Sequence, residues 1–232
     1  MTKEEFIEEL KKININILDC QLEKLEQFYK LLIICNEKIN LTTITEKKEV
    51  YLKHFYDSLT LIKAVDLTKK LKVLDVGTGA GFPGIVLKIV FPNLKITLLD
   101  SLQKRIKYLD EIIKELDLNN INTICARSEE YTNIHREEYD LVVSRAVAHL
   151  KILSEITFSS VKVGGNLIAR KGNINQELEE SKEIINKMNG EIKDIIEFIL
   201  PYENSKRTLV KIEKKEKTNS KYPRKYSIIK NK

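Results

Sequence analysis

The sequence predicts an α/β fold built on a doubly wound, mostly parallel sheet. Two observations lead to this prediction. Short runs of Val, Ile and Leu recur at intervals that leave room for a helix between them, and two later apolar runs have no helix between them. Parallel strands need crossover connections of a dozen or more residues, whereas antiparallel neighbours can be joined by a short turn. The length of 232 residues suits one such domain with a single core.

The first sixty residues are predicted to be helical. Thr2 and Glu5 have the spacing of a capping box at the start of a helix. A second amphipathic helix is indicated by apolar residues at three- and four-residue steps. These are Leu18, Leu22, Leu25, Phe28, Tyr29 and Leu32. A third helical segment is expected from about Glu49 to Lys63. Residues 1–66 are therefore expected to form an N-terminal helical extension packed on the core.

Five buried strands are expected from Lys72 onward, alternating with helices. The predicted strands are Val73–Val76, Ile96–Leu99, Ile121–Cys125, Leu141–Ser144 and Leu167–Ala169. A helix at Glu177–Lys187 precedes the last two apolar runs, Ile192–Leu200 and Thr208–Ile212, which we expect to pair antiparallel. Together these elements predict a seven-stranded, mostly parallel sheet with an antiparallel last strand, in a core of residues 67–213.

Composition narrows the class of protein. The longest unbroken apolar run, Leu31–Cys35, has five residues, far fewer than the roughly 18 that a membrane span needs. The N-terminus lacks the basic start and apolar block of a secretory signal, so we expect a cytoplasmic protein without a membrane partner. Cys20, Cys35 and Cys125 lie in apolar stretches without disulfide or zinc spacing. We expect all three in the core, and no metal site.

Basic residues are concentrated near the C-terminus. Residues 201–232 carry eleven Lys and Arg against three Asp and Glu, whereas the net charge of the whole chain is +6. A cationic segment attracts polyanions, which makes nucleic acid the first candidate partner; a solvated tail that only aids solubility fits the charge equally well. The aromatic residues within Tyr222–Tyr226 suit base stacking as well as phosphate contact. We treat residues 214–232 as a basic C-terminal tail.

The strongest local signal is a glycine turn after the first predicted strand. Gly77 and Gly79 would let the backbone turn sharply and approach a ligand closely, and a third glycine follows at Gly81. A dinucleotide fingerprint would need a glycine where Phe82 stands, and no Gly-Lys-Ser/Thr follows for a nucleoside triphosphate. The remaining Gly-x-Gly-x-Gly pattern resembles the first motif of class I S-adenosylmethionine (SAM) methyltransferases.

An acidic residue at the end of the next strand supports a cofactor site. Asp100 lies 23 residues past Gly77, about where an acid that binds both ribose hydroxyls is expected. A glycine turn alone is a weak signal. In combination with this acid and five alternating strands, it predicts cofactor binding, with SAM preferred over NAD on the glycine spacing.

Longer strings of residues point to a family. They are Asn40–Thr42, His54–Leu59, Asp75–Ile85, Leu99–Ser101 with Lys104 and Arg105, Val143–Ala148, Lys171 with Gly172, and Tyr222–Lys225. With these strings the chain resembles the bacterial RsmG family, also called glucose-inhibited division protein B or GidB. The resemblance spans nearly the whole chain, and the combined strings are far more specific than the glycine turn.

The resemblance implies a Rossmann-like class I methyltransferase that moves the SAM methyl group to N7 of one guanine in 16S ribosomal RNA. Its partner would be that RNA or the small ribosomal subunit, and we expect a monomer. Where the family usually has Ala-Glu or Val-Glu, this chain has Ser128-Glu129, so contact there is expected from the backbone or from Glu129. The expected cofactor residues are Gly77, Thr78, Gly79, Gly81, Phe82, Asp100, Ser101, Ser128, Glu129 and Arg145.

The chemistry of N7 fits the motifs at the fourth strand. N7 carries a lone pair and no proton, so an in-line displacement needs positioning and no general base. Ser144–Val147 is not the Asp/Asn-Pro-Pro-Tyr/Phe motif of enzymes that methylate exocyclic amines. Methylation at pyrimidine carbon 5 would need a cysteine nucleophile beside the cofactor. Arg145 is our candidate catalytic residue, because it could bind guanine O6, a phosphate or the SAM carboxylate; alternatively, it holds a loop by an ion pair.

Eight further residues are candidates for RNA contact. His54 and Asp57 lie three apart on one predicted helical face and could shape a guanine pocket, although Asp57 could equally pair with His54 or cap a helix. The basic candidates near strand ends, in loops and in the tail are Arg127, Arg170, Lys171, Arg207, Arg224 and Lys225. Two other readings stay open: a non-catalytic RNA-binding or ribosome-assembly factor on this fold, and a small-molecule methyltransferase.

Overall fold

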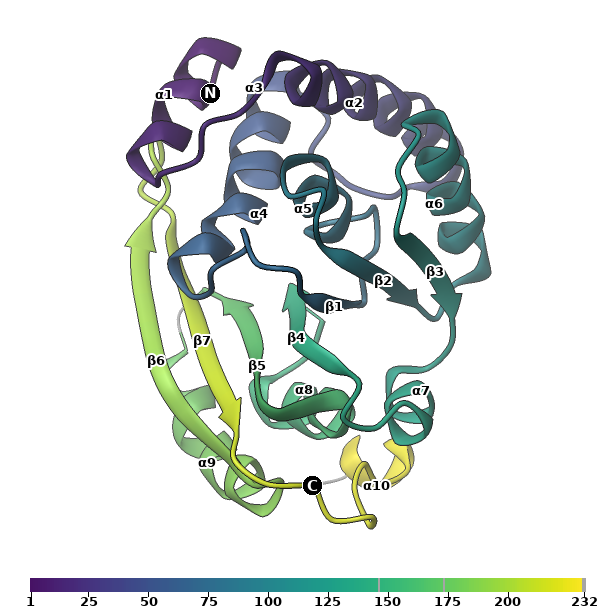
Figure 1. The fold of residues 1–232 in the computed structure, drawn as a ribbon, viewed down its shortest axis with the longest axis vertical. Coiled ribbons are helices and arrows are strands. Elements are labelled where there is room, and N and C mark those ends of the chain that lie inside the picture. Colours follow the sequence, from purple (N-terminus) through teal and green to yellow (C-terminus); the bar gives the residue numbers. More distant parts are fainter. Residues whose placement is uncertain (146, 173, 231–232) are drawn as a thin grey trace.

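A twisted mixed sheet runs through the protein, with helices on both faces (Figure 1). The computed structural model describes residues 1–145, 147–172 and 174–230, so Ala146 of the fourth-strand string lies outside the described residues. Within them the sheet has seven strands in the order β3-β2-β1-β4-β5-β7-β6. The strands are β1 (Lys72–Val76), β2 (Lys95–Asp100), β3 (Ile121–Cys125), β4 (Tyr139–Arg145), β5 (Val161–Lys171), β6 (Gly190–Ile199) and β7 (Lys206–Lys214).

The strand pairing confirms the predicted sheet. Strands β1 to β5 pair in parallel, and β7 runs antiparallel to both β5 and β6. Strand β5 is longer than predicted and begins at Val161, because Gly164 and Gly165 interrupt the apolar run without ending the strand. The five parallel strands end at the same edge of the sheet, where ligands bind in open α/β folds.

Two hydrophobic clusters lie on opposite faces of the sheet. Leu141 and Val143 of β4 contribute to one cluster, while Val142 between them contributes to the other. This alternation follows from the two-residue period of a strand. The first cluster includes residues of the N-terminal helices and of α5 (Gly84–Val90) and α6 (Gln103–Glu115). The second includes residues of α7 (Ser128–Ile134), α8 (Leu150–Thr157) and α9 (Asn175–Lys187).

The N-terminal helices form as predicted, with one exception. In α1 (Lys3–Lys12) the Thr2 side chain accepts a hydrogen bond from the Glu5 amide, and the Glu5 carboxylate accepts one from the Thr2 amide, which confirms the capping box. Helix α2 (Asp19–Ile39) buries Leu22, Leu25, Phe28 and Leu32. Leu18 precedes α2 and is 61% exposed, so its predicted place on the buried face is wrong.

The third N-terminal segment is helical, but its turns are not uniform. It consists of α3 (Lys47–Val50), a π-helical stretch η1 (Tyr51–Tyr56), α4 (Asp57–Leu59) and a 3-10 turn η2 (Thr60–Lys63). π-Helical turns occur frequently at functional sites, because the widened turn redirects side chains. Here the π stretch contains His54 and is followed directly by Asp57, and both side chains point into the protein.

The prediction that all three cysteines are core residues is wrong for two of them. Cys20 and Cys125 are exposed, and Cys35 is partly buried. Cys125 ends β3, which is an edge strand with a neighbour on one side only, so its residues are only partly covered. For the same reason β3 does not meet the expectation of a fully buried strand. Cys20 lies in the first turn of α2, and its side chain faces solvent.

Residues 215–230, here named the C-terminal segment, fold back against the loop after α7 and against α8, and end in α10 (Tyr226–Lys230). Tyr222 and Ile229 are buried, so the alternative of a solvated tail is wrong for the described part. Lys214, which we assigned to the tail, instead completes β7 and is fully buried.

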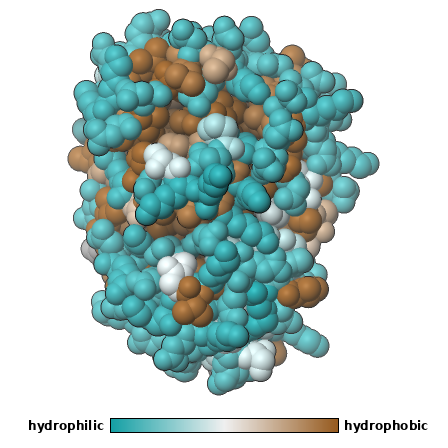
Figure 2. Space-filling model, in the orientation of Figure 1, coloured by the Kyte–Doolittle hydropathy of each residue, from teal (hydrophilic) through white to brown (hydrophobic). Residues whose placement is uncertain are grey.

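The face of the molecule seen in Figure 2 is divided between hydrophilic and hydrophobic residues. Figure 2 shows a mostly hydrophilic face, with hydrophobic residues gathered chiefly in its upper half, where Figure 1 places the N-terminal helices. None of the helices in the described ranges is both long and apolar enough to cross a membrane.

Candidate cofactor and substrate site

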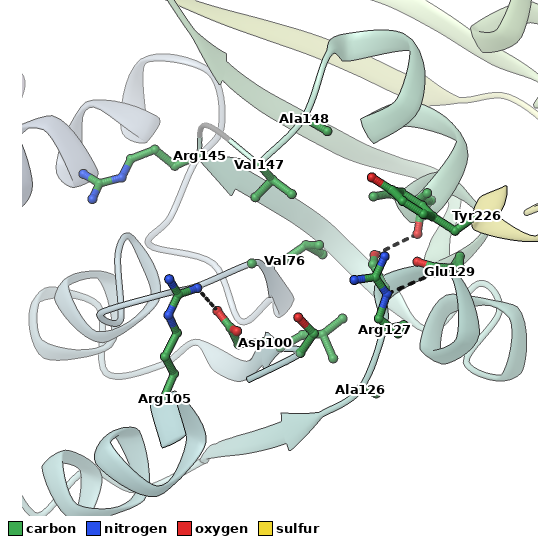
Figure 3. A pocket seen from close by; sticks show the side chains of 15 residues that line it. Val76, Asp100, Arg105, Ala126, Arg127, Glu129, Arg145, Val147, Ala148 and Tyr226 are labelled. Atoms are coloured by element: carbon green, nitrogen blue, oxygen red, sulfur yellow. Dashed lines mark hydrogen bonds and ion pairs between the residues drawn. The ribbon is translucent and has the colours of Figure 1, made fainter. Parts of the chain in front are cut away.

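A cavity of about 340 Å³ opens at the carboxyl ends of the parallel strands; we name it the main cavity. Its volume falls within the range of small-molecule sites. Figure 3 shows Asp100 pointing toward Arg105 on one side, and Arg127, Glu129 and Tyr226 gathered on the other. The main cavity is lined by six of the ten predicted cofactor residues. These are Gly77, Asp100, Ser101, Ser128, Glu129 and Arg145.

Asp100 is the acceptor at the end of β2. One carboxylate oxygen accepts hydrogen bonds from the Gly79 amide at 3.0 Å and from Arg105 Nη1 at 3.1 Å, and the other accepts one from the Leu102 amide at 3.0 Å. A carboxylate offers about four acceptor positions. One position therefore remains for a ligand hydroxyl, and a second becomes free if Arg105 moves.

At Gly77 and Gly79 the turn after β1 has the backbone conformation for which glycine was inferred. Gly77, Gly79 and Gly81 all have positive φ, at 67°, 60° and 93°. A Cβ on Gly77 would lie 2.4 Å from a methyl carbon of Val147, which itself lines the main cavity. The Asp75 carboxylate stabilises the turn, because it accepts hydrogen bonds from the Thr78 hydroxyl and the Gly84 amide. Complete burial raises the pKa of Asp75 to about 6.

A second, smaller cavity of about 220 Å³ lies beside the glycine turn; we name it the loop cavity. Thr78, Gly79 and Phe82 line it, and it shares Gly77 and Arg145 with the main cavity. The predicted loop residues therefore line two neighbouring cavities. Gly81 lines neither cavity. A Cβ there would lie 2.6 Å from a side-chain carbon of Ile85, so its place in the turn is explained by packing.

Arg145 extends from the end of β4 toward the π-helical stretch. Its two terminal nitrogens lie 3.2 Å from His54 Nδ1, and Nη1 also lies 3.2 Å from the Lys53 carbonyl oxygen. Its guanidinium carbon stands 5.1 Å from the centre of the Phe82 ring, on which His54 also stacks. Because a guanidinium group only donates, His54 Nδ1 accepts, and the Nε2 proton is donated to Thr42 Oγ1 at 3.0 Å. His54 thus orients Arg145 as a neutral imidazole.

We expect His54 to make the protein sensitive to acid. Burial and the Arg145 charge lower its pKa from 6.5 to about 3. Below pH 6.5 the unfolded chain therefore binds a proton that the folded protein excludes, so the free energy of unfolding falls as the pH decreases, by on the order of 2 kcal/mol at pH 5. The variant His54→Asn should show a flatter dependence between pH 7.5 and 5 in urea unfolding. Parallel curves for the two proteins would contradict this role of His54.

A third cavity of about 580 Å³ adjoins the main cavity and is rich in positive charge; we name it the basic cavity. Arg145, Val147 and Ala148 line both cavities. The remaining predicted phosphate contacts from β5 and β7 line the basic cavity and not the main cavity; they are Arg170, Lys171 and Arg207. The structure thus gathers four predicted cations around a space next to the cofactor cavity.

Asp57 lies beneath the basic cavity and is fully buried. Its carboxylate forms ion pairs with Arg170 and with Arg207, the latter at 3.2 Å. Neither predicted alternative, a pair with His54 or a helix cap, describes these contacts. Because the carboxylate is inaccessible, Asp57 can shape a substrate pocket only by positioning the two arginines.

The other predicted RNA contacts lie apart from the basic cavity. Arg127 lines the main cavity and is half exposed, with Glu129 3.4 Å from its Nε. Arg224 is held by Glu155, while Lys225 is exposed.

His149 lines the basic cavity and lies 3.2 Å from Glu180. No group of His, Cys, Asp and Glu suited to holding a metal occurs among the described residues.

Two residues that line the main cavity were not among the predicted cofactor contacts. Arg105 lines both the main and the loop cavity and pairs with Asp100. Its place in the first turns of the helix that follows Asp100 was a usable signal. Tyr226 lines the main cavity although it belongs to the C-terminal segment. In sequence it is remote from the strand ends, and the pattern there indicated RNA stacking only.

Comparison with solved structures shows that this fold is shared with methyltransferases. Solved structures of similar fold include a SAM-dependent methyltransferase from Aquifex aeolicus, with a TM-score of 0.54 and 20% identity, covering 72% of this chain and 93% of that one. Precorrin-6y C5,15-methyltransferase from Geobacter metallireducens has a TM-score of 0.53 and 14% identity, covering 68% and 87%. At these identities the likeness concerns the fold.

Closer relatives are found by sequence. Proteins named ribosomal RNA small subunit methyltransferase G from Bacillus thuringiensis strain Al Hakam and Bacillus anthracis strain A0248 are each 46% identical to this chain over 228 residues. Each alignment covers 97% of this chain and 95% of the relative. The family model described as GidB, rRNA small subunit methyltransferase G, matches residues 21–210, which include the glycine turn, Asp100 and Arg145. The chain therefore belongs to the GidB family.

Proposed function

We propose that this protein transfers the methyl group of SAM to N7 of a specific guanine in 16S ribosomal RNA, acting as a monomer in the cytoplasm. The observation that carries the proposal is a small-molecule cavity at the strand ends that opens beside a cation-lined cavity, with Arg145 at their boundary. Membership of the GidB family, whose named relatives are small-subunit rRNA methyltransferases, supports the same substrate class.

The residues of the main cavity fit SAM. Asp100 retains acceptor capacity for a ribose hydroxyl, and Gly77, which has no side chain, exposes its backbone at the cavity wall. The N-terminus of α7, at Ser128 and Glu129, offers backbone N–H groups to the polar edge of a base. The loop cavity, bounded by Thr78 and Arg145, would take the amino-acid end of the cofactor.

The basic cavity fits a nucleotide of the RNA substrate. Arg170 lines the basic cavity and is nearly buried, with its guanidinium held by Asp57. Hydrogen bonds that involve a charged group are roughly twice as strong as those between neutral groups. A phosphate oxygen or guanine O6 could accept such bonds from the cations that line the cavity, and Arg207 and Lys171 add positive charge there. The location of Arg145 between the cavities suits the positioning of guanine against the methyl donor.

The proposed reaction depends on how guanine N7 is positioned against the methyl carbon rather than on a proton transfer. SAM supplies a methyl group bonded to a positively charged sulfur. As the N7–carbon bond forms, the carbon–sulfur bond breaks, its electron pair stays on sulfur, and the positive charge moves to guanine. Because N7 bears no proton, no general base is needed. The protein would hold N7 about 3 to 3.5 Å from the methyl carbon, in line with the breaking bond. His54 and Phe82 fix the Arg145 side chain, and the basic cavity holds the nucleotide.

Labelling with tritiated SAM tests this proposal. Small-subunit RNA and small-subunit particles that lack the modification should each be incubated with the protein. We expect label on one guanine, at which the RNA becomes cleavable after borohydride and aniline treatment. Particles already methylated at this guanine are the control and should accept no further label. Absence of label on both unmodified substrates, or label at a base that resists the cleavage, would reject N7 methylation of this RNA.

A further inference from the structure

Two arginines help to fix the C-terminal segment to the rest of the protein. Arg136 donates hydrogen bonds to the carbonyl oxygens of Thr218 at 2.7 Å and Tyr222 at 2.6 Å. Arg224 forms a two-bond pair with the carboxylate of Glu155, each bond being 2.6 Å long, and the Glu155 side chain is only 2% exposed. A pair in this geometry resists sliding and rotation. The segment therefore has a defined path up to α10.

This path brings Tyr226 to the wall of the main cavity. Its ring centre lies 4.7 Å from the guanidinium carbon of Arg127, which also lines the cavity. Figure 3 shows the ring beside Arg127 and Glu129, on the far side of the cavity from Arg105. Every other residue that lines this cavity comes from the strand ends, the loops after them or helices α6 to α8. Tyr226 therefore adds to the cavity wall a side chain from a separate part of the chain, close to the C-terminus.

The arrangement indicates which part of a bound cofactor would meet Tyr226. Asp100 at the end of β2 marks the ribose position, and the loop after β3, with Arg127 and Ser128, lies further along the same edge. A nucleoside whose ribose is held at Asp100 would therefore extend its base toward Arg127 and Tyr226. A purine has two flat faces that stack on aromatic rings and on guanidinium planes. Tyr226 and Arg127 offer both kinds of surface.

We propose that Tyr226 packs against the adenine ring of SAM and makes the C-terminal segment part of the cofactor site. The proposal rests on the proposed use of SAM and extends it to a residue outside the family match, which ends at residue 210. Tyrosine suits this task because a large aromatic surface is presented at the cost of ordering only two side-chain torsions. Basic residues of the same segment, such as Lys225, would then be fixed close to the bound cofactor.

Calorimetric titration with S-adenosylhomocysteine tests the contact. We expect Tyr226→Ala to weaken binding about 5- to 100-fold, since stacking of one base on an aromatic ring has this effect. Tyr226→Phe retains the ring and should bind within about threefold of the unchanged protein. The control is Tyr202→Ala, because Tyr202 is 58% exposed and lies outside all the cavities described above. The same loss should be seen with 5′-methylthioadenosine, which lacks the amino-acid end. Unchanged affinity of Tyr226→Ala, or a loss confined to S-adenosylhomocysteine, would overturn the assignment.

A fluorescent variant provides an independent measurement that keeps an aromatic ring at the position. The chain contains no tryptophan, so Tyr226→Trp introduces a single reporter. We expect its emission to change on addition of S-adenosylhomocysteine, with a midpoint equal to the calorimetric dissociation constant. Calorimetric binding without any emission change would overturn the contact while leaving the cofactor assignment intact. Failure of the unchanged protein to bind S-adenosylhomocysteine would overturn both.

Discussion

Replacement of Asp57 by asparagine should lower the free energy of unfolding by about 3 to 5 kcal/mol, the usual cost of removing one partner from a buried ion pair. Asp57 is fully buried and pairs with both Arg170 and Arg207. Asparagine has nearly the same shape but no charge, so two positive groups would remain in the interior without compensation. Urea unfolding at pH 7.5 measures the change.

The matched control for this experiment is Glu179→Gln. It makes the same change from acid to amide in an exposed pair, in which Glu179 lies 2.6 Å from Lys182. Exposed pairs contribute about 0 to 1 kcal/mol, so this variant should remain close to the unchanged protein. A loss below 1 kcal/mol in Asp57→Asn would mean that the two arginines are solvated and that Asp57 does not organise the basic cavity.

Replacement of Arg145 by alanine should reduce kcat/KM for methylation of small-subunit particles by about 100-fold, because reacting groups misplaced by even 1 Å lose about this much. Arg145 borders the main, loop and basic cavities, and its guanidinium is fixed by His54 and Phe82. Arg145→Lys should recover little of the loss, because an ammonium group cannot reach His54 and the ring of Phe82 with the same planar geometry. Single-turnover kinetics with tritiated SAM measures the effect.

Removal of a distant cation separates this local effect from a change in net charge. Lys95→Ala removes one positive charge at the start of β2, which is the end of the strand opposite Asp100, and its kcat/KM should change by less than about threefold. Circular dichroism should show that both variants are folded. Activity of Arg145→Ala within threefold of the unchanged protein would exclude the guanidinium from substrate positioning.

The central part of the fold could be predicted from the sequence because its strands have two covered faces. The continuous apolar runs of β1, β2 and β4 are typical of strands between two helical layers, and the structure places them there. Edge strand β3 has a similar apolar run but is only partly covered, which is why the exposure of Cys125 was predicted wrongly. A run of apolar residues indicates a strand but not its place in the sheet.

The residues of the site also fall into two groups: some are placed by the strand to which they belong, and others are placed by contacts with distant parts of the chain. Asp100 and Arg145 could be located because they are the last residues of strands whose ends meet at one edge of the sheet. The partners of Asp57 could not, because Arg170 and Arg207 lie 113 and 150 residues away along the chain, and no local pattern encodes such a contact. Tyr226 was missed for a similar reason. Its place depends on the path of the whole C-terminal segment and on anchors such as Arg136.

The position of β7 in the sheet has a consequence for biosynthesis. Among the described strands, β6 pairs with β7 alone, although β6 comes first in the chain. Since a ribosome makes the chain from its N-terminus, β6 emerges before its only partner has been translated. Tyr226 emerges later still. A partly translated chain thus has an incomplete sheet and a cavity open on one side, and the wall of that cavity closes only after β7 and the residues up to Tyr226 have emerged from the ribosome.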